Sequence, residues 1–394
     1  MLNNYLKVMV VSCLLICKSS SAFILGIGIH PGNNGLSAQD YLKYAQEYGF
    51  NSVRTDFFWS RIENRQGIFN DSDYLRTQDY IFSNSISSLG KSALLVLDYG
   101  NRIYTPKGYP ENQSEISAYV NYASRTAKRY KGKVLYYEIW NEWLQGTGVS
   151  KKNKPTADPK IYTELVKQTY KAIKAVDPNA IIMIGSINPN SPSYIKWLNG
   201  LINEGILDYC DAISIHTYFA HDAPLVSKTP EGALSNIDKL EKMLKERSGR
   251  DIDLYITEMG YSQTEKDVYS TSDMILQNVA KFMFLAKSRP FIKGIWWYDL
   301  INDGDDRTNK EHNFGFLYYD KTPKKTARYI QSISSYMMDD SIMFSSQIID
   351  DKVIVTARNK TTQVSKKFEW VPYGSITESE LDSYVNSLSS LTDH

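Results

Sequence analysis

Two carboxylates follow buried strands at separate points of the chain and could share one chemical task. The apolar run that begins at Val134 ends in Asn141 and Glu142, and a second run that begins at Asp253 ends in Glu258. Paired carboxyl groups suit glycosidic bond cleavage, in which one protonates the leaving oxygen and the other stabilises or attacks the anomeric carbon. Taken alone, Glu142 could as well cap its strand and form a local ion pair, but the second carboxylate favours catalysis.

The elements that must position these carboxylates repeat a strand–helix pattern along most of the chain. Continuous apolar runs are typical of parallel strands buried on both faces, and active sites of α/β barrels lie at the carboxyl ends of such strands. Helical periodicity between the runs supplies covering helices, and Ser37 can cap the first of them. The eight predicted strands lie at 23–30, 51–59, 92–99, 134–140, 180–187, 211–218, 253–260 and 291–299.

We therefore predict an α/β fold, a (β/α)8 TIM barrel with a small C-terminal β-appendage. A chain of 394 residues is long enough for one such barrel and an extension. Short apolar runs at 342–349, 352–357 and 366–370 are too few for an independent sandwich, so we expect them to pack on the barrel. The predicted divisions are a signal peptide (1–22), the barrel (23–338), the β-appendage (339–372) and a polar, partly disordered tail (373–394).

The motifs around the two carboxylates resemble those of a known group of enzymes. Glu-Ile-Trp-Asn-Glu at 138–142, on the fourth strand, and Ile-Thr-Glu-Met-Gly at 256–260, on the seventh, are similar to the retaining glycoside hydrolases of clan A. Among these the chain looks most like glycoside hydrolase family 39 and related bacterial exopolysaccharide glycosidases. The resemblance covers roughly residues 23–335 and rests on the eight strand ends together.

The resemblance implies a retaining mechanism with two carboxylates. Glu142 would be the general acid/base, with its pKa raised by Glu258, and Glu258 would be the nucleophile, kept ionised by Arg54 on the second strand. Asn141 would hydrogen-bond the sugar 2-hydroxyl, and Tyr218 on the sixth strand would donate a hydrogen bond to Glu258. The alternative for Arg54 is a surface or interface arginine.

Three further residues are candidate substrate contacts. His30 ends the first strand, and His216 lies two residues before Tyr218, on the same face of its strand. His216 would contact a sugar hydroxyl, although a structural histidine is as consistent with the sequence. The resemblance places a tryptophan of the eighth strand under the sugar, and we favour Trp297 over Trp296 for this position.

Two other side chains have less direct roles. Glu138 lies four residues before Glu142, deeper along the strand, and is expected to be a buried structural carboxylate in an ion pair. Trp59 follows the second strand, where it could stack on a sugar or belong to the core.

Other chemistries lack their sequence signals. Five histidines without a His-Glu-x-x-His pattern give no support for a metal site, and no cofactor is predicted. The glycines after Phe23 do not complete a dinucleotide fingerprint, because Pro31 replaces the third one. No Gly-x-Ser-x-Gly elbow is present, which argues against a serine hydrolase.

Composition and the N-terminal segment indicate an exported protein. Lys7, the apolar run 8–16 and small residues up to Ala22 are typical of a signal peptide, with an uncleaved anchor as the alternative. The mature chain would be secreted or periplasmic, without a membrane span, and Cys210 would be its single cysteine. A formal net charge of +1 gives no indication of nucleic-acid binding.

The function predicted from these observations is a retaining β-glycosidase, acting within a bacterial exopolysaccharide or capsular polysaccharide. An exo-acting enzyme similar to β-xylosidases and a non-catalytic carbohydrate-binding protein are the alternatives. The expected partner is a polysaccharide or oligosaccharide substrate, and the oligomeric state stays open.

Overall fold

The computed structural model describes residues 23–150, 152, 158–218, 228–265 and 271–392. The predicted signal peptide lies outside these residues. Within the described part of the chain, no helix combines the length and the apolar character that crossing a membrane requires.

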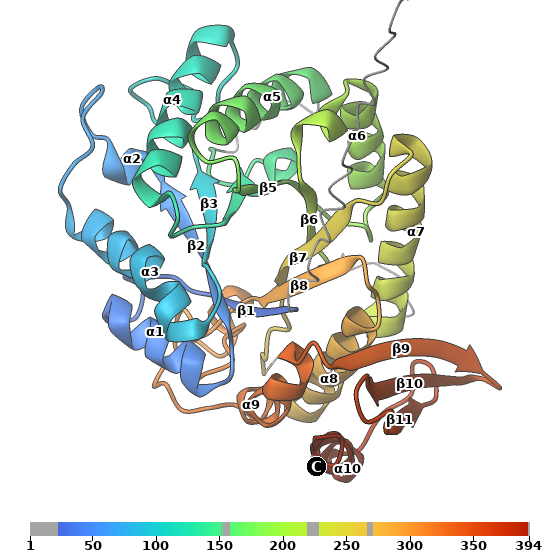
Figure 1. Cartoon of the computed structure of the whole chain (residues 1–394). Helices are drawn as coiled ribbons and strands as arrows, with labels where there is room; N and C mark the ends of the chain where they lie inside the picture. The colour runs from blue at the N-terminus through green and yellow to red at the C-terminus, as the bar shows by residue number, and fades with distance from the viewer. Residues whose placement is uncertain (1–22, 151, 153–157, 219–227, 266–270, 393–394) are drawn as a thin grey trace, which may run out of the picture.

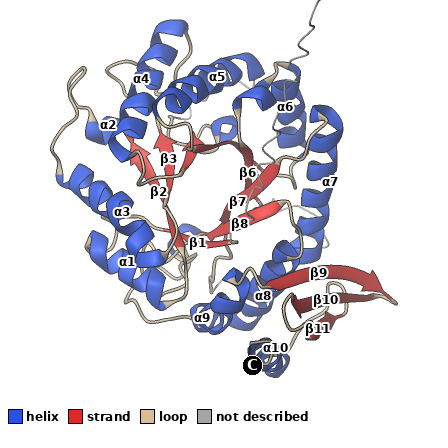
Figure 2. Cartoon of the chain, viewed as in Figure 1, coloured by secondary structure: helices blue, strands red, loops and turns tan. Residues whose placement is uncertain are grey.

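Eight parallel strands close into a barrel, in chain order, and helices surround it (Figures 1 and 2). The predicted (β/α)8 barrel is therefore confirmed. The strands are β1 (Ile24–Gly28), β2 (Ser52–Phe58), β3 (Leu94–Asp98), β4 (Tyr136–Ile139), β5 (Ile181–Ile187), β6 (Ala212–His216), β7 (Asp253–Met259) and β8 (Ile292–Trp297).

The helices begin where the sequence supplies caps. Ser37 caps the first helix through a reciprocal pair of hydrogen bonds with Asp40, and Asp158 caps the helix that begins with Pro159. The α-helices of the barrel are α1 (Ala38–Glu47), α2 (Trp59–Ile62), α3 (Asp73–Leu89), α4 (Gln113–Tyr130), α5 (Pro159–Val176), α6 (Pro192–Asn203), α7 (Pro230–Ser248), α8 (Ser272–Lys287) and α9 (Lys325–Met338). Short 3-10 turns are η1 (Trp143–Gln145), η3 (Ile206–Tyr209) and η5 (Lys310–His312).

The core has two compartments, one inside the barrel and one between the strands and the helices. Trp296 fills the inside, where its ring lies against Tyr136 and Tyr255 and its Nε1 donates to Ser52 Oγ over 3.0 Å. This ring leaves no room for a side chain at Gly26 of β1, because a Cβ there would lie 2.2 Å from Trp296 Cδ1. The inside of the barrel below the mouth is thus filled, and a ligand can enter only at the strand ends.

The C-terminal sheet packs against α8, at the lower right of Figure 1. The ring of Phe284, on α8, lies parallel to the rings of Phe344 and Phe368, at centroid distances of 6.1 and 5.1 Å. The predicted β-appendage is therefore present and joined to the barrel by aromatic contacts. Its strands are β9 (Ile342–Ile349), β10 (Lys352–Asn359) and β11 (Ser365–Trp370), in the order β11-β10-β9.

The prediction of a partly disordered tail is wrong for most of residues 373–394. Helix α10 (Glu378–Ser389) begins at a Thr377 capping box and buries Leu381 and Leu388. Its apolar residues recur at helical spacing among many serines, and the polar composition hid this short amphipathic pattern.

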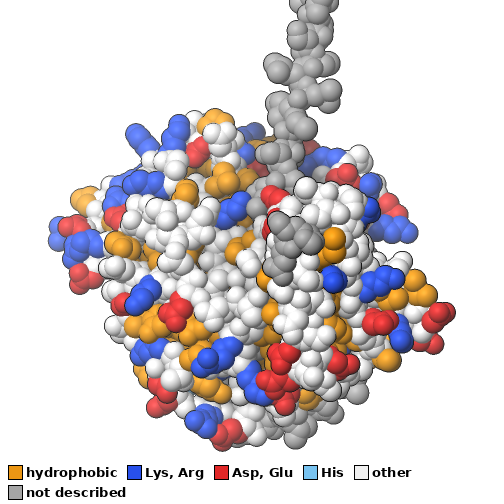
Figure 3. Space-filling model, turned by 60° about the horizontal axis from the view of Figure 1, so that its bottom comes forward, with side chains coloured by type: hydrophobic (Ala, Val, Ile, Leu, Met, Phe, Trp, Pro, Cys, Tyr) orange, Lys and Arg blue, Asp and Glu red, His pale blue; other side chains and the backbone are white. Residues whose placement is uncertain are grey.

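Charged side chains of both signs are interspersed on the face of the molecule shown in Figure 3.

Candidate active site

The end of β4 turns two polar side chains toward the mouth of the barrel. The strand ends at Ile139, and Trp140 and Glu142 then adopt left-handed backbone conformations, with φ values of 65° and 51°. Such conformations cost roughly 1–3 kcal/mol each for residues other than glycine and persist only where the surroundings impose them. Asn141 between them donates its backbone N–H to Asp98 Oδ1 over 3.1 Å, which ties this turn to β3.

Irregularities in β5 and between β6 and β7 bring further side chains to the same point. The pairing of β5 with β6 shifts register between Ile184 and Ile187, and the pairing of β6 with β7 shifts before His216, which then lies opposite Glu258. A bulge of this kind changes the direction in which side chains point. Through the first irregularity, Ser186 Oγ donates to Glu138 over 3.0 Å and accepts from the backbone N–H of Glu142 over 3.1 Å.

Arg54 is a buried cation that joins Glu258 to Glu138 and Asn141. Its Nη1 lies 2.7 Å from Glu258 Oε1, its Nε lies 3.1 Å from Glu138 Oε2, and its Nη2 donates to Asn141 Oδ1 over 3.0 Å. Glu138 is fully buried, and although burial alone would raise its pKa, Arg54 and His216 lower it to about 2. The predicted structural ion pair of Glu138 is confirmed, and the surface alternative for Arg54 is wrong.

His216 lies between the two candidate catalytic carboxylates. Its Nδ1 is 3.1 Å from Glu142 Oε1 and 3.5 Å from Glu258 Oε2, and its Nε2 contacts Thr257 Oγ1 at 3.1 Å. Burial alone would lower the pKa of His216, but the charge of Glu258 and hydrogen bonds to Glu138 and Glu142 raise it to about 10. His216 is 1% exposed, so the predicted contact with a sugar hydroxyl is wrong and the structural alternative holds.

The two carboxylates are close enough to act on one bond. One oxygen of Glu142, one of Glu258 and a ring nitrogen of His216 all lie within 4.8 Å of one another. Glu142 also accepts from Thr147 Oγ1 over 2.9 Å and from Gln145 Nε2 over 3.4 Å, in the loop that follows β4. The geometry can therefore support a reaction that needs one carboxyl group on each side of a bond.

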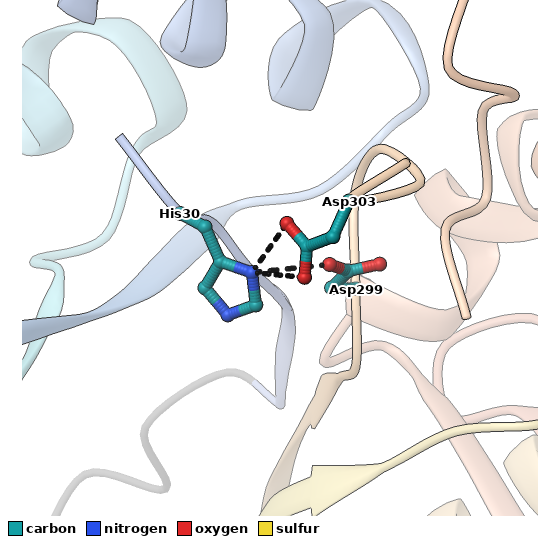
Figure 4. Close-up of side chains that lie close together, drawn as sticks. All are labelled: His30, Asp299 and Asp303. Carbon is teal, nitrogen blue, oxygen red and sulfur yellow. Dashed lines mark hydrogen bonds and ion pairs between the residues drawn. The ribbon is translucent and has the colours of Figure 1, made fainter. Parts of the chain in front are cut away.

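A second cluster of charges lies where β1 and the segment after β8 meet (Figure 4). His30 Nδ1 is 2.9 Å from Asp303 Oδ2 and 3.3 Å from Asp299 Oδ2. Burial alone would lower the pKa of His30, but Asp303 and Asp299 raise it to about 9, and burial raises the pKa of Asp299 to about 8. Lys324 fixes the segment after β8, because its Nζ donates to Asn302 Oδ1 over 2.9 Å and to the carbonyl of Asn313 over 3.0 Å.

Comparison with known sequences assigns this barrel to a family. The sequence model of the Cellulase family (glycosyl hydrolase family 5) matches residues 19–298, which is more than half of the chain. The chain belongs to glycosyl hydrolase family 5. It is thus a glycoside hydrolase with the clan A fold, and the predicted resemblance to clan A is confirmed.

Solved structures of other glycoside hydrolases share the fold of this family 5 chain. A family 39 glycoside hydrolase from Bacteroides cellulosilyticus WH2 is 22% identical with a TM-score of 0.71, over 89% of this chain and 71% of that one. A monomeric β-xylosidase from Caulobacter crescentus CB15 is 15% identical with a TM-score of 0.59, over 85% and 73%. An endo-β-1,4-mannanase from Thermotoga petrophila is 16% identical with a TM-score of 0.59, over 86% and 84%.

The pKa order predicted for Glu142 and Glu258 is reversed in the structure of this family 5 hydrolase. Burial raises the pKa of Glu258 more than the charges of His216 and Arg54 lower it. Burial acts on Glu142 in the same direction, but hydrogen bonds from His216 and Thr147 hold its pKa below the usual value. The charges of Glu142 and Glu138 add to the effect of burial at Glu258, whereas Glu142 has the shorter contact with the imidazolium.

Two predicted substrate contacts differ from their predictions. Trp297 is fully buried and points away from the barrel axis, against Phe282 of α8 and Phe316, so the prediction that it lies under the sugar is wrong. Tyr218 forms no hydrogen bond with Glu258 among the described residues, although the charge of Glu258 contributes to its raised pKa after burial. Its ring lies instead against Tyr298, at a centroid distance of 6.4 Å.

Tyr298 is an aromatic residue of the mouth that sequence reasoning did not single out. It follows β8 directly, and its ring lies 5.2 Å from the ring of His30. Trp59 is 1% exposed and stacks on Tyr104 and Tyr122, so it belongs to the core and not to the cleft.

Sequence reasoning missed two carboxyl groups and a tyrosine at the mouth. Asp56 and Asp98 end the inward-facing rows of β2 and β3, and burial followed by the charge of Asp56 raises the pKa of Asp98 well above its usual value. Tyr99 Oη accepts from Asn141 Nδ2 over 3.1 Å. The signal that could have found Asp56 is the alternation Ser52, Arg54, Asp56, which places all three side chains on one face of β2.

Within the described part of the chain, two groups of side chains have the composition of a metal site, namely His30 with Asp299 and Asp303, and Glu142 with His216 and Glu258. In both groups a raised imidazole pKa supplies the positive charge that faces the carboxylates. The contacts described above are therefore those of ion pairs between imidazolium and carboxylate groups.

Proposed function

We propose that this hydrolase is a retaining β-glycosidase that cleaves within a bacterial exopolysaccharide or capsular polysaccharide, outside the cytoplasm. The observation that carries the retaining mechanism is the separation of the two carboxylates, whose nearest oxygens lie within 4.8 Å. Retaining enzymes hold these groups about 5–5.5 Å apart, whereas inverting enzymes need about 6.5–9.5 Å to admit a water molecule.

We infer the roles of the pair from their positions. Arg54 contacts Glu258 and supports its ionised form during attack on the anomeric carbon, while Glu142 lies beside the loop of Gln145 and Thr147, where a leaving group departs. In the first step Glu258 forms an ester bond to that carbon, the glycosidic bond breaks, and Glu142 gives its proton to the leaving oxygen. In the second step water gives a proton to Glu142 and displaces Glu258 from the carbon.

Asn141 is positioned to assist both steps. Its Oδ1 accepts from Arg54 and its Nδ2 donates to Tyr99 Oη, which fixes the amide and leaves the second N–H of Nδ2 to donate to a sugar. We assign this N–H to the 2-hydroxyl of the sugar next to Glu258. Such a hydrogen bond strengthens as charge develops at the anomeric carbon.

Two kinds of solved enzyme with this fold support different modes of cleavage. The Thermotoga petrophila enzyme is an endo-β-1,4-mannanase, and the Caulobacter crescentus enzyme is a β-xylosidase. We favour endo cleavage because a long loop between Tyr99 and Asn112 follows β3 at the mouth, where such loops commonly shape the binding cleft. Exo cleavage of the β-xylosidase type is the alternative.

The test is hydrolysis of purified exopolysaccharides and aryl β-glycosides by the chain without residues 1–22. Glu258→Gln should abolish release of oligosaccharides, and Glu265→Gln, an exposed glutamate after the same strand, serves as the matched control. Mass spectrometry of early products separates endo cleavage, which gives several fragment sizes, from exo cleavage, which gives a single sugar. Proton NMR should show the β anomer first. Activity that survives Glu258→Gln, or an α anomer as first product, would contradict the proposal.

A further inference from the structure

One side of the mouth, from β8 through β1 and β2 to β3, carries four carboxyl groups around a single imidazole. We call His30, Asp56, Asp98, Asp299 and Asp303 the acidic wall. His30, Asp56 and Asp303 are partly exposed, and Asp98 and Asp299 lie behind them at 0% and 2% exposure. Figure 4 shows the part of the wall formed by His30, Asp299 and Asp303.

The members of the acidic wall act on one another electrostatically. The charge of Asp56 helps to raise the pKa of both His30 and Asp98, which makes these three groups neighbours across β1, β2 and β3. Asp303 is also fixed by Asn33, whose Nδ2 donates to Oδ1 over 2.9 Å. A Cβ on Gly28 would lie 3.8 Å from side-chain atoms of Asp299 and Tyr298, which places the end of β1 beside these two residues.

The wall is richer in acceptors than in donors. Asp98 Oδ2 and Asp299 Oδ1 are buried, and no N–H or O–H group of the described residues donates to either, although the carboxyl groups of Asp56 and Asp98 are close enough to share a proton. A buried carboxyl oxygen without a donor is costly and indicates that a proton or a ligand belongs beside it. The partly exposed carboxylates in front of them, Asp56 and Asp303, are correspondingly suited to accept from hydroxyl groups.

The cations that the described strands bring to the mouth are already paired. Arg54 contacts Glu138 and Glu258, His216 contacts Glu142 and Glu258, and His30 contacts Asp299 and Asp303, all through the distances given above. A bound sugar carboxylate would therefore meet carboxylates on the wall and would have to compete with protein carboxylates for Arg54 and His216, while the charge of His30 is already balanced by Asp299 and Asp303 at Nδ1.

We propose that the acidic wall binds the hydroxyl groups of an uncharged sugar beside Glu258 and excludes uronic acids from that position. Asp56 and Asp303 accept from the sugar hydroxyls, and His30 Nε2, which has no partner among the described residues, faces the same opening. A uronate at this position loses its hydration and gains like-charge neighbours, which is how binding sites reject a competing ligand. The inference deepens the proposed function and rests on it.

The first test compares matched pairs of methylumbelliferyl substrates, the β-glucoside with the β-glucuronide and the β-galactoside with the β-galacturonide. We expect kcat/KM to be at least about 100-fold higher for the neutral member of a cleaved pair. Asp303→Asn should reduce this ratio about 10-fold, because it removes one repelling charge. Asp305→Asn, which removes the same charge from an exposed position in the same loop, should leave the ratio unchanged. Equal or faster cleavage of a uronide would overturn the proposal.

The second test uses the polysaccharide that the hydrolase cuts. The sugar at each new reducing end is the one that occupied the position beside Glu258, and reduction with borodeuteride before mass spectrometry labels it. A neutral labelled sugar supports the acidic wall, and a labelled uronic acid overturns it. Failure to cut any polymer or aryl glycoside contradicts the proposed function instead. In that case the proposal for the acidic wall is tested by thermal stabilisation of the protein by neutral manno-oligosaccharides and by oligogalacturonides. Stronger stabilisation by the oligogalacturonides would overturn it.

Discussion

At the scale of single residues, the site depends on two buried cations that balance the charges of three carboxylates. Glu138, Glu142 and Glu258 converge on one guanidinium and one imidazolium, those of Arg54 and His216. Each carboxylate would keep a proton if it were buried alone, and each cation would lose its charge. Because these five groups are buried together and interact, the removal of one of them changes the protonation of the others.

Replacement of Glu142 by alanine should affect substrates according to their leaving groups. An aryl glycoside with a good leaving group needs little protonation, so it should lose much less activity than a natural glycan, for which loss of the general acid costs roughly 10²–10⁴-fold. Azide can enter the space left by the side chain and attack the glycosyl-enzyme, which should restore turnover and give a glycosyl azide. Kinetics with dinitrophenyl glycosides, with and without azide, measure both effects. Equal losses on all substrates would contradict the assignment.

Replacement of His216 by asparagine should move the acidic limb of the pH–activity profile. Loss of the imidazolium removes a positive charge 3.1 Å from Glu142 and 3.5 Å from Glu258, which raises the pKa values of both carboxyl groups. The pair then ionises at higher pH, so the acidic limb of kcat/KM should shift upward by about one unit. A profile with an unchanged acidic limb would show that His216 is neutral in the working enzyme.

At the scale of elements, strand periodicity predicted the barrel and its strand ends but not the local departures from that periodicity. The positions of Glu142, Glu258 and Arg54 at the mouth could be predicted, because each follows from its place on a strand and from the family motifs. Trp297 was misplaced because two adjacent tryptophans face opposite sides of β8, and their shared residue type does not say which one faces inward.

The register shifts are the second feature that sequence could not supply. The irregularity in β5 turns Ser186 into the barrel, with a φ of 43°, and the shift before His216 aligns it with Glu258. An extra residue in a strand leaves the apolar composition of the strand intact, so the pattern looks regular. The carboxyl groups of the acidic wall were missed for a related reason, because Asp56 and Asp98 look like ordinary residues at strand ends.

Replacement of Phe284 by alanine should destabilise the junction between the barrel and the β-appendage. Phe284 is fully buried and lies against Phe344 and Phe368, so its loss leaves a cavity that costs about 3–5 kcal/mol. Ile348→Ala, on an exposed position of β9, is the control and should change stability by less than about 0.5 kcal/mol. Urea unfolding, followed by circular dichroism and tryptophan fluorescence, measures both variants. A small loss for Phe284→Ala would show that the appendage contributes little to the fold.

At the scale of the whole molecule, the groups of the site make the stability of the fold dependent on pH. The pKa of His30 is raised to about 9, that of His216 to about 10 and that of Asp299 to about 8. In the opposite direction, burial lowers the pKa of Lys324 and Lys287 to about 8, and Arg54 and His216, against the effect of burial, lower the pKa of Glu138 to about 2. These shifts set separate pH windows.

Between pH 6.5 and pH 8 the folded chain should lose stability as the pH rises. The two histidines and Asp299 keep protons in this window that the unfolded chain releases, and a raised folded-state pKa contributes stability that fades as the pH approaches it. The lysines oppose this trend only above about pH 8, and Glu138 matters only below about pH 4.5. Each retained proton corresponds to at most about 1.4 kcal/mol per pH unit. Calorimetry should therefore give a lower Tm at pH 8 than at pH 6.5, with a weaker dependence in His30→Asn, and a Tm that rises over this interval would mean that the buried imidazoles are neutral.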